Sequence, residues 1–229
     1  MCYTLAQQNF INILNTETTY IADSLERSDQ RWSAITHGIG FGVLAIIFLP
    51  YIYYCSNLTD WVGLAGISIF LFTVMATYGS SALYHYKYFT PDRIFYQRQD
   101  HISIFFMIAG SNTPFILIYM DGWQQIAFMA LFWSLVVIGT VYKLYFLNKY
   151  PWFSLCFYLA IGWLGLVTAS QVYTMLPWNC ILYMIGGGVA YTIGTYYYNN
   201  DDIRYNHTIW HLWVMAGTML HLVGVITML

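Results

Sequence analysis

The stretch NHTIWHLWVMAGTMLHLVGV, residues 206–225, carries three of the chain's six histidines in a run that is otherwise largely apolar. About 20 apolar residues are what a helix needs to cross the hydrocarbon core of a bilayer. Ionisable side chains in such a helix are costly, and they usually face the interior of a bundle or a cavity where they mark function. The stretch therefore predicts a transmembrane helix, and its imidazoles His207, His211 and His221 are candidates for function.

The composition of the whole chain agrees with a membrane protein. Of 229 residues, 59% are apolar and 8% are charged, whereas an ordinary soluble domain has about 25% charged residues. Eight Lys and Arg against ten Asp and Glu give a formal charge of -2. No basic stripe is present, so a nucleic-acid partner is excluded.

The cysteines and the amino-terminal residues show no special chemistry. Cys2, Cys55, Cys156 and Cys180 are scattered without metal-ligand spacing, and we interpret them as small buried hydrophobes. Residues 1–25 contain no Lys or Arg and no long apolar run, which argues against a cleavable signal peptide. They are expected to form a polar lead or a helix along the membrane surface.

Apolar runs long enough to span a bilayer occur seven times. The expected spans are 32–55, 61–84, 100–120, 123–147, 152–175, 178–199 and 205–228. Without a fixed-period repeat, the chain is expected to be one all-α integral membrane domain over residues 32–229, preceded by a cytoplasmic segment over residues 1–31.

The basic residues predict the orientation of these spans. With seven alternating spans, all eight fall on one side of the membrane: Arg27, Arg31, Lys87, Arg93, Arg98, Lys143, Lys149 and Arg204. The opposite joints hold Asp60 and Asp121 instead. By the positive-inside rule the amino terminus is cytoplasmic and the carboxyl terminus is outside. The expected location is the cell (inner) membrane, with multiple passes.

With this orientation, most of the polar side chains in the spans gather near the cytoplasmic face. They are His37, His85, Asp100, His101, His207 and His211. His207 and His211 are four residues apart, so they share one helix face with Cβ atoms about 5–6 Å apart. His85 lies at the same depth, four residues after Ser81. Three imidazoles suffice for a catalytic zinc site that leaves a fourth position for water.

Less specific interpretations remain open for each histidine. The pair His207 and His211 could alone act as interhelical hydrogen-bond donors. His37 and His101 are expected to be hydrogen-bonded anchors near the interface. His221 follows His211 by ten residues, about 15 Å along a helix, so it cannot bind the same ion. We expect His221 to be buried and hydrogen-bonded to a neighbouring helix.

Four motifs together resemble a known family. They are THGIG at 36–40, SALYH at 81–85, DHISIFFMIAGSNTP at 100–114 and NHTIWH at 206–211. Their order is similar to that in the bacterial hemolysin III branch of the progestin and adipoQ receptor family, which more distantly resembles the alkaline ceramidases. The resemblance runs from about residue 29 to the end of the chain.

The resemblance implies a seven-helix protein with zinc near the cytoplasmic face. Its S-x-x-x-H and H-x-x-x-H motifs carry the metal ligands onto His85, His207 and His211. The family's serine falls on Ser81 and its acid on Asp100.

Two further positions bear on the resemblance. His221 matches a histidine usual in the family. Where bacterial members commonly have an Asn after an acid, this chain departs from the pattern, with Ser33 after Asp29.

Hydrolysis of a lipid amide or ester bond is the first functional hypothesis. Zinc lowers the pKa of bound water and polarises a carbonyl. Asp100 would move the proton, and Ser81 would orient the water or stabilise the oxyanion. The substrate would be a membrane lipid whose chain enters between apolar helices.

The alternative is a non-enzymatic sensor or receptor, or a haemolysis-associated factor affecting membrane permeability or energetics, in which zinc is structural. A transporter or proton relay is disfavoured, because the spans contain no matching pair of broken half-helices. Pro114 and the glycines at 186–188 could loosen their helices, although close helix packing is the preferred interpretation of the glycines.

Overall fold

The protein is an all-helical bundle. The computed structural model describes residues 2–169 and 174–229, with side chains for 22–167 and 174–229. These residues form α1 (Cys2–Cys55), α2 (Trp61–Tyr86), α3 (Arg93–Tyr119), α4 (Gly122–Phe146), α5 (Pro151–Ala169), α6 (Trp178–Tyr198) and α7 (Asn206–Thr227). Each of the seven apolar runs overlaps one helix, which confirms the all-α fold class. Residues 170–173 of the fifth expected span, 152–175, lie outside the described residues.

Five of the described helices are long and apolar enough to cross a membrane. They are α1 over Ala22–Cys55, α2, α3, α4 and α7. The described apolar part of α5, Pro151–Val167, is shorter than a full span. α6 is not among the helices that meet the length and hydropathy of a full span. The chain is therefore an integral membrane protein with several passes.

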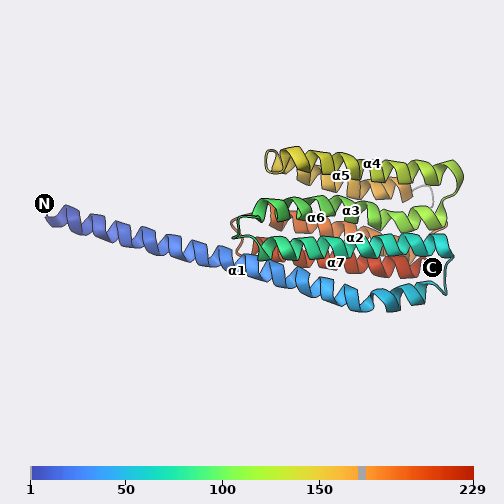
Figure 1. The fold of residues 1–229 in the computed structure, drawn as a ribbon, viewed down its shortest axis with the longest axis horizontal. Helices are drawn as coiled ribbons and strands as arrows, with labels where there is room; N and C mark the ends of the chain where they lie inside the picture. Colours follow the sequence, from blue (N-terminus) through green and yellow to red (C-terminus); the bar gives the residue numbers. More distant parts are fainter. Residues whose placement is uncertain (1, 170–173) are drawn as a thin grey trace.

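The helices run back and forth along one axis (Figure 1). α2 packs against α1 and α3, α7 packs against α6 and α1, and α4 and α5 cover α3. The joints α2–α3, α4–α5 and α6–α7 all lie at the end where α1 enters the bundle. This arrangement brings the first turns of α3 and α7 beside the last turn of α2.

Small residues allow the helices to approach closely. A Cβ atom on Gly66 of α2 would lie 3.1 Å from the Cα of Pro114 in α3. Within the glycine triplet of α6, a Cβ on Gly187 would lie 2.2 Å from the His221 ring and one on Gly188 would touch Trp163. The triplet therefore serves close packing, as expected.

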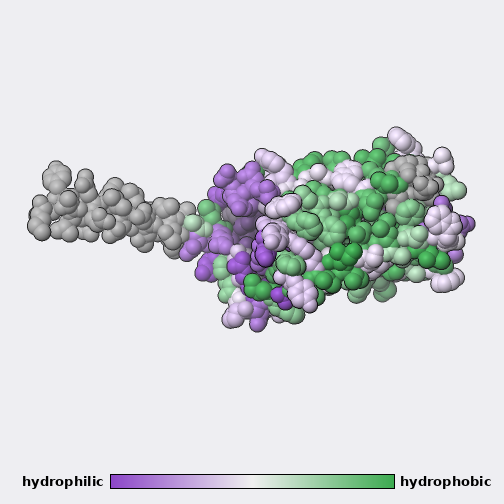
Figure 2. All heavy atoms as spheres, turned by 90° about the horizontal axis from the view of Figure 1, so that it is seen from above, coloured by the Kyte–Doolittle hydropathy of each residue, from purple (hydrophilic) through white to green (hydrophobic). Residues whose placement is uncertain are grey.

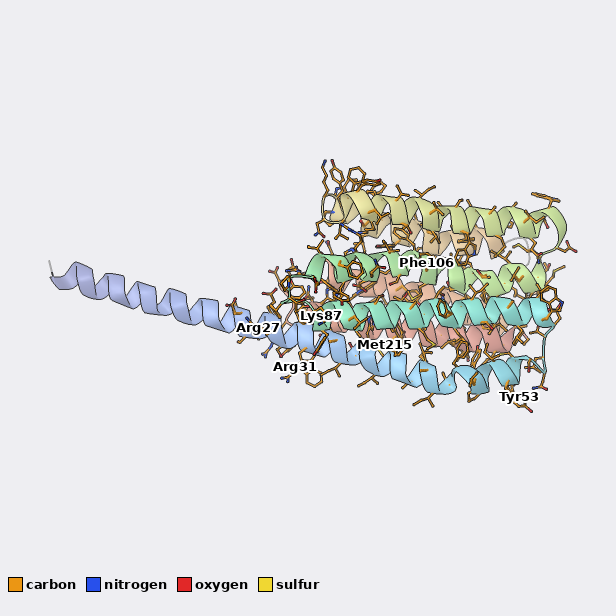
Figure 3. All side chains as sticks on the ribbon, in the orientation of Figure 1. Arg27, Arg31, Tyr53, Lys87, Phe106 and Met215 are labelled. Carbon is orange, nitrogen blue, oxygen red and sulfur yellow. The ribbon has the colours of Figure 1, made fainter. Side chains whose placement is uncertain are left out.

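The surface is divided into an apolar belt and a polar end. Apolar residues cover the middle of the bundle, whereas hydrophilic residues gather where α1 enters (Figure 2). Arg27, Arg31 and Lys87 lie at this polar end, and Tyr53 lies at the opposite end (Figure 3). An exposed apolar belt of this kind suits lipid as the surrounding solvent.

Some sequence-based boundaries and burial states differ in the structure. α3 begins at Arg93, seven residues before the expected span, because hydropathy reports the length in lipid and polar residues can extend a helix beyond it. α1 continues through residue 31 without a break. Cys55 and Cys180 are buried, but Cys156 is exposed, so the burial expected of Cys156 was wrong. α5 turns this side chain outward. The Cys2 side chain lies outside the described residues.

Candidate metal centre

Three imidazoles from two helices converge at the polar end of the bundle. His85 comes from the last turn of α2, and His207 and His211 come from the first two turns of α7. One ring nitrogen of each lies within 4.8 Å of the other two. Their ring centroids are 4.7 Å apart for His85 and His207, 4.9 Å for His85 and His211, and 5.0 Å for His207 and His211. The spacing argument therefore selected side chains that meet in space.

α1 fixes the orientation of two of these rings. Nδ1 of His85 donates to Oε1 of Gln30 at 2.6 Å, and Nδ1 of His211 donates to the Ser33 carbonyl at 3.1 Å. A proton on Nδ1 leaves Nε2 as the nitrogen with a lone pair. Nε2 of His85 is buried and has no hydrogen-bond partner in the part of the chain that the structure describes. An unpaired ring nitrogen fits a metal ligand when the other nitrogen of the ring is held by a hydrogen bond, as it is in His85.

The start of α7 is fastened to α1. Oδ1 of Asp29 accepts from the Thr208 hydroxyl at 2.6 Å and from the Thr208 backbone amide at 3.2 Å. A carboxylate at a helix amino terminus satisfies free N–H groups and favours the helix dipole. Ser33 Oγ lies 3.2 Å from Thr208 Oγ1. Ser33 thus supports α7 with its hydroxyl and His211 with its carbonyl.

His37 is not the hydrogen-bonded anchor that its position suggested. Its ring stacks on His211, with centroids 3.6 Å apart and planes inclined by 2°, and also on Tyr78. Both His37 nitrogens are buried and without a hydrogen-bond partner among the described residues. Because its ring stacks on Tyr78 of α2 and on His211 of α7, His37 acts as a flat spacer beside the His211 ring.

The two candidate catalytic side chains lie beside the histidines. Ser81 Oγ is 3.5 Å from Nε2 of His211, and the Ser81 hydroxyl also interacts with the Asp100 carboxylate. Ser81 and Asp100 are both buried, with 1% and 8% of their surfaces exposed. Ser81 thus bridges the α7 imidazole and the acid at the start of α3.

His101 is hydrogen-bonded, as expected. Its Nδ1 lies 3.1 Å from the Lys143 ammonium of α4, and its carbonyl accepts from the Tyr158 hydroxyl of α5. These bonds link α3 to α4 and α5.

Comparison with known sequences agrees with this arrangement. Residues 26–222 match the family described as Haemolysin-III related. The Hemolysin-3 homolog of Bacillus subtilis is 31% identical over 188 residues, which cover 81% of this chain and 87% of that protein. The chain belongs to the haemolysin-III related family. Hemolysin-3 of Bacillus cereus is 28% identical over 190 residues, covering 82% and 86% of the two chains.

A human protein matches part of this haemolysin-III related chain. The monocyte to macrophage differentiation factor of Homo sapiens is 28% identical over 123 residues, 53% of this chain and 50% of that protein. The family resemblance inferred from the four motifs is confirmed.

A cavity of about 230 Å³ opens beside the histidines of this haemolysin-III protein. At the polar end, its lining includes Ser81, Asp100, His207 and His211. Further along it is lined mainly by apolar side chains of α3, α5, α6 and α7, among them Met107, Phe115, Leu159, Leu166 and Met184. An end lined by ionisable and hydroxyl side chains and an apolar interior suit an amphiphilic ligand.

His221 lies at the far part of this cavity, away from the other histidines. Its Nε2 is 3.2 Å from the Met184 carbonyl of α6, which confirms the predicted interhelical hydrogen bond. Its ring packs edge-on against Tyr191. His221 therefore joins α6 to α7 and is not part of the metal centre.

The sequence reasoning missed the contribution of α1 to the site. Gln30, Ser33 and His37 are spaced by three and four residues, and the same spacing continues to the buried Gly40 and Leu44. This helical periodicity could have shown that they share the inward face of α1. The carbonyl of Ser33 leaves no signal in the sequence, because every residue has one.

Proposed function

We propose that this haemolysin-III protein is a zinc-dependent hydrolase that cleaves an amide or ester bond of a membrane lipid. One observation carries the proposal: three imidazoles converge beside a buried carboxylate and a hydroxyl, and two of them, His207 and His211, line the head of an apolar cavity together with those groups. A purely structural zinc would need neither the acid nor the cavity.

His85, His207 and His211 would hold the metal. The convergence of one ring nitrogen from each residue and the hydrogen bonds behind His85 and His211 are the features that fit a three-histidine site. Zinc bound there would lower the pKa of water and polarise the lipid carbonyl.

Asp100 and Ser81 would handle the proton and the developing charge. The Asp100 carboxylate would accept a proton from the attacking water and return it to the leaving amine or alcohol. The Ser81 hydroxyl, 3.5 Å from Nε2 of His211, would hold the water in place or donate to the oxyanion. The apolar cavity would hold the acyl chain and exclude bulk water.

The membrane arrangement is part of the proposal. All seven helices would span the inner cell membrane as one domain over residues 32–229, with residues 1–31 in the cytoplasm and the carboxyl terminus outside. The basic residues at the polar end support this orientation. The site would then act on lipids at the cytoplasmic face.

Product analysis with purified, zinc-loaded protein tests the proposal. The protein is incubated with N-acyl and O-acyl lipids, and released fatty acid is measured by mass spectrometry. The wild type should release fatty acid, and Asp100→Asn should be slower by about 10²-fold or more while retaining its zinc. If the wild type holds zinc but releases nothing from any lipid, the metal is structural and ties α2 to α7. The protein would then be a non-enzymatic sensor or permeability factor.

A further inference from the structure

Lys143 occupies an unusual position on α4. The helix buries only one narrow face, formed by Phe132, Val136, Gly139 and Lys143 at spacings of four, three and four residues. The first three fit tightly, since a Cβ atom on Gly139 would lie 2.5 Å from the Phe105 ring. The fourth residue of this packed stripe is Lys143, which carries an ammonium group and has 1% of its residue surface exposed.

The hydrogen-bond partners of the Lys143 ammonium carry no negative charge. Its Nζ donates to Ser154 Oγ at 2.7 Å and lies 3.1 Å from Nδ1 of His101. Both partners are uncharged when His101 is neutral. The Asp100 carboxylate interacts with Lys143 electrostatically, but no carboxylate of the described residues lies within ion-pair distance of Nζ. A buried cation without a paired anion is costly.

The usual behaviour of a lysine at a helix end does not explain this position. Lysines near the ends of membrane helices normally extend toward water at the interface. Lys149, in the same α4–α5 joint, does so and is exposed, with its Nζ 5.5 Å from the ring centroid of Tyr150. Lys143 instead points into the bundle.

Lys143 lines the same cavity as the candidate metal centre. Gln97, Asn148 and Ser154 extend the polar lining on its side, and Asp100 lies toward the histidines. Lys143 and Asp100 offset one another in charge, so a bound zinc would leave this end of the cavity net positive. Beyond it the lining becomes apolar. The polar end of the cavity would therefore favour a negatively charged ligand group, and the apolar part beyond it has room for a hydrocarbon chain.

We infer that Lys143 binds the anionic group of an amphiphile whose hydrocarbon chain lies in the apolar part of the cavity. The anion is a carboxylate or a phosphate, which completes the hydrogen bonding of the ammonium and neutralises its charge. This inference rests on the proposed function and names its substrate class. The substrate would be a lipid in which the scissile amide or ester joins an acyl chain to a headgroup that bears a carboxylate or phosphate.

Equilibrium binding to the zinc-loaded, full-length protein in a neutral detergent tests this inference. The probes share one chain and differ in headgroup: palmitate, hexadecyl phosphate and the neutral hexadecanol. Palmitate and hexadecyl phosphate distinguish a carboxylate site from a phosphate site. The variants are Lys143→Met, which removes the charge at similar volume, Lys143→Arg, which keeps it, and Lys149→Met as a matched control for the loss of a nearby positive charge.

The wild type should bind at least one anionic probe more tightly than hexadecanol. Lys143→Met should weaken that anionic binding by about tenfold to a hundredfold, the range for a hydrogen bond to a charged group, and should leave hexadecanol binding unchanged. Lys143→Arg should keep most of the preference, and Lys149→Met all of it. Zinc content and melting midpoint establish that each variant is folded.

Two results would overturn the inference. One is a wild type without preference for either anionic probe, a comparison that needs no variant. The other is a folded Lys143→Met protein that binds the anionic probe as tightly as the wild type, which would mean that zinc alone holds the anion. Because none of the probes contains a cleavable amide or carboxylic ester, the outcome is independent of hydrolysis. A Lys143-dependent preference without any hydrolysis would support this inference and reject the proposed enzyme.

Discussion

Nδ1 of His85 and Oε1 of Gln30 are 2.6 Å apart, although 55 residues separate them in the chain. The bond joins α2 to α1 and leaves Nε2 of His85 facing the other two histidines. Together with the bond from His211 to the Ser33 carbonyl, it makes α1 the supporting layer behind the candidate ligands. Second-layer bonds of this kind hold a ligand's tautomer and orientation before the metal arrives.

Replacing Gln30 should therefore weaken metal binding without touching a ligand. Gln30→Leu is expected to lower zinc affinity by about 10–100-fold, because nothing then holds the proton on Nδ1 of His85. Gln30→Glu, which keeps an acceptor oxygen, should retain the affinity. Zinc titration against a competing chelator measures both.

Ser33→Ala serves as the matched control for Gln30→Leu. The His211 ring bonds to the backbone carbonyl of Ser33, which the substitution preserves. Zinc affinity should stay close to that of the wild type. A loss as large as that of Gln30→Leu would show that α1 acts through general packing and not through the bonds to the imidazoles.

His37 should be replaceable by another flat ring. The ring stacks on His211, and its nitrogens have no hydrogen-bond partner within the described residues, so His37→Phe should keep full zinc stoichiometry. His37→Ala should also bind zinc but melt at a lower temperature, since it leaves a void of the size that costs about 2–5 kcal/mol in cores. Zinc loss in His37→Phe at an unchanged melting midpoint would instead make His37 a metal ligand.

The sequence predicted the histidine cluster because two strong constraints act together. A four-residue spacing fixes the relation of His207 to His211 on any helix, and alternating spans fix the depth of His85. Neither constraint predicts whether a side chain at the polar end of the bundle points toward water or into the bundle. Lys143 could face water or the bundle, and only the packing of Phe132, Val136 and Gly139 against α3 decides that it turns inward.

The fit of α6 against α7 depends on Gly187 and His221. A Cβ atom on Gly187 would lie 2.2 Å from Cδ2 of His221 and 3.0 Å from the Gly217 carbonyl. Gly187→Ala should therefore destabilise the bundle by about 1–3 kcal/mol and lower its melting midpoint in detergent. Zinc stoichiometry should be unaffected, because this contact is remote from the metal centre.

Gly186→Ala and a double variant make this prediction specific. A Cβ on Gly186 would only touch Leu220 at 3.5 Å, an ordinary contact, so its melting midpoint should change little. In Gly187→Ala with His221→Ala, the combined destabilisation should be smaller than the sum of the single effects, since one variant relieves the clash made by the other. Additive effects would mean that Gly187 and His221 do not contact each other.

The most direct test of the zinc centre is the metal content of the purified protein. The wild type should contain about one zinc per chain, as a three-histidine site requires, and the double variant His207→Ala with His211→Ala should contain none while His221→Ala keeps its full content. Zinc at full stoichiometry in the folded double variant would contradict the assignment of the site to His85, His207 and His211.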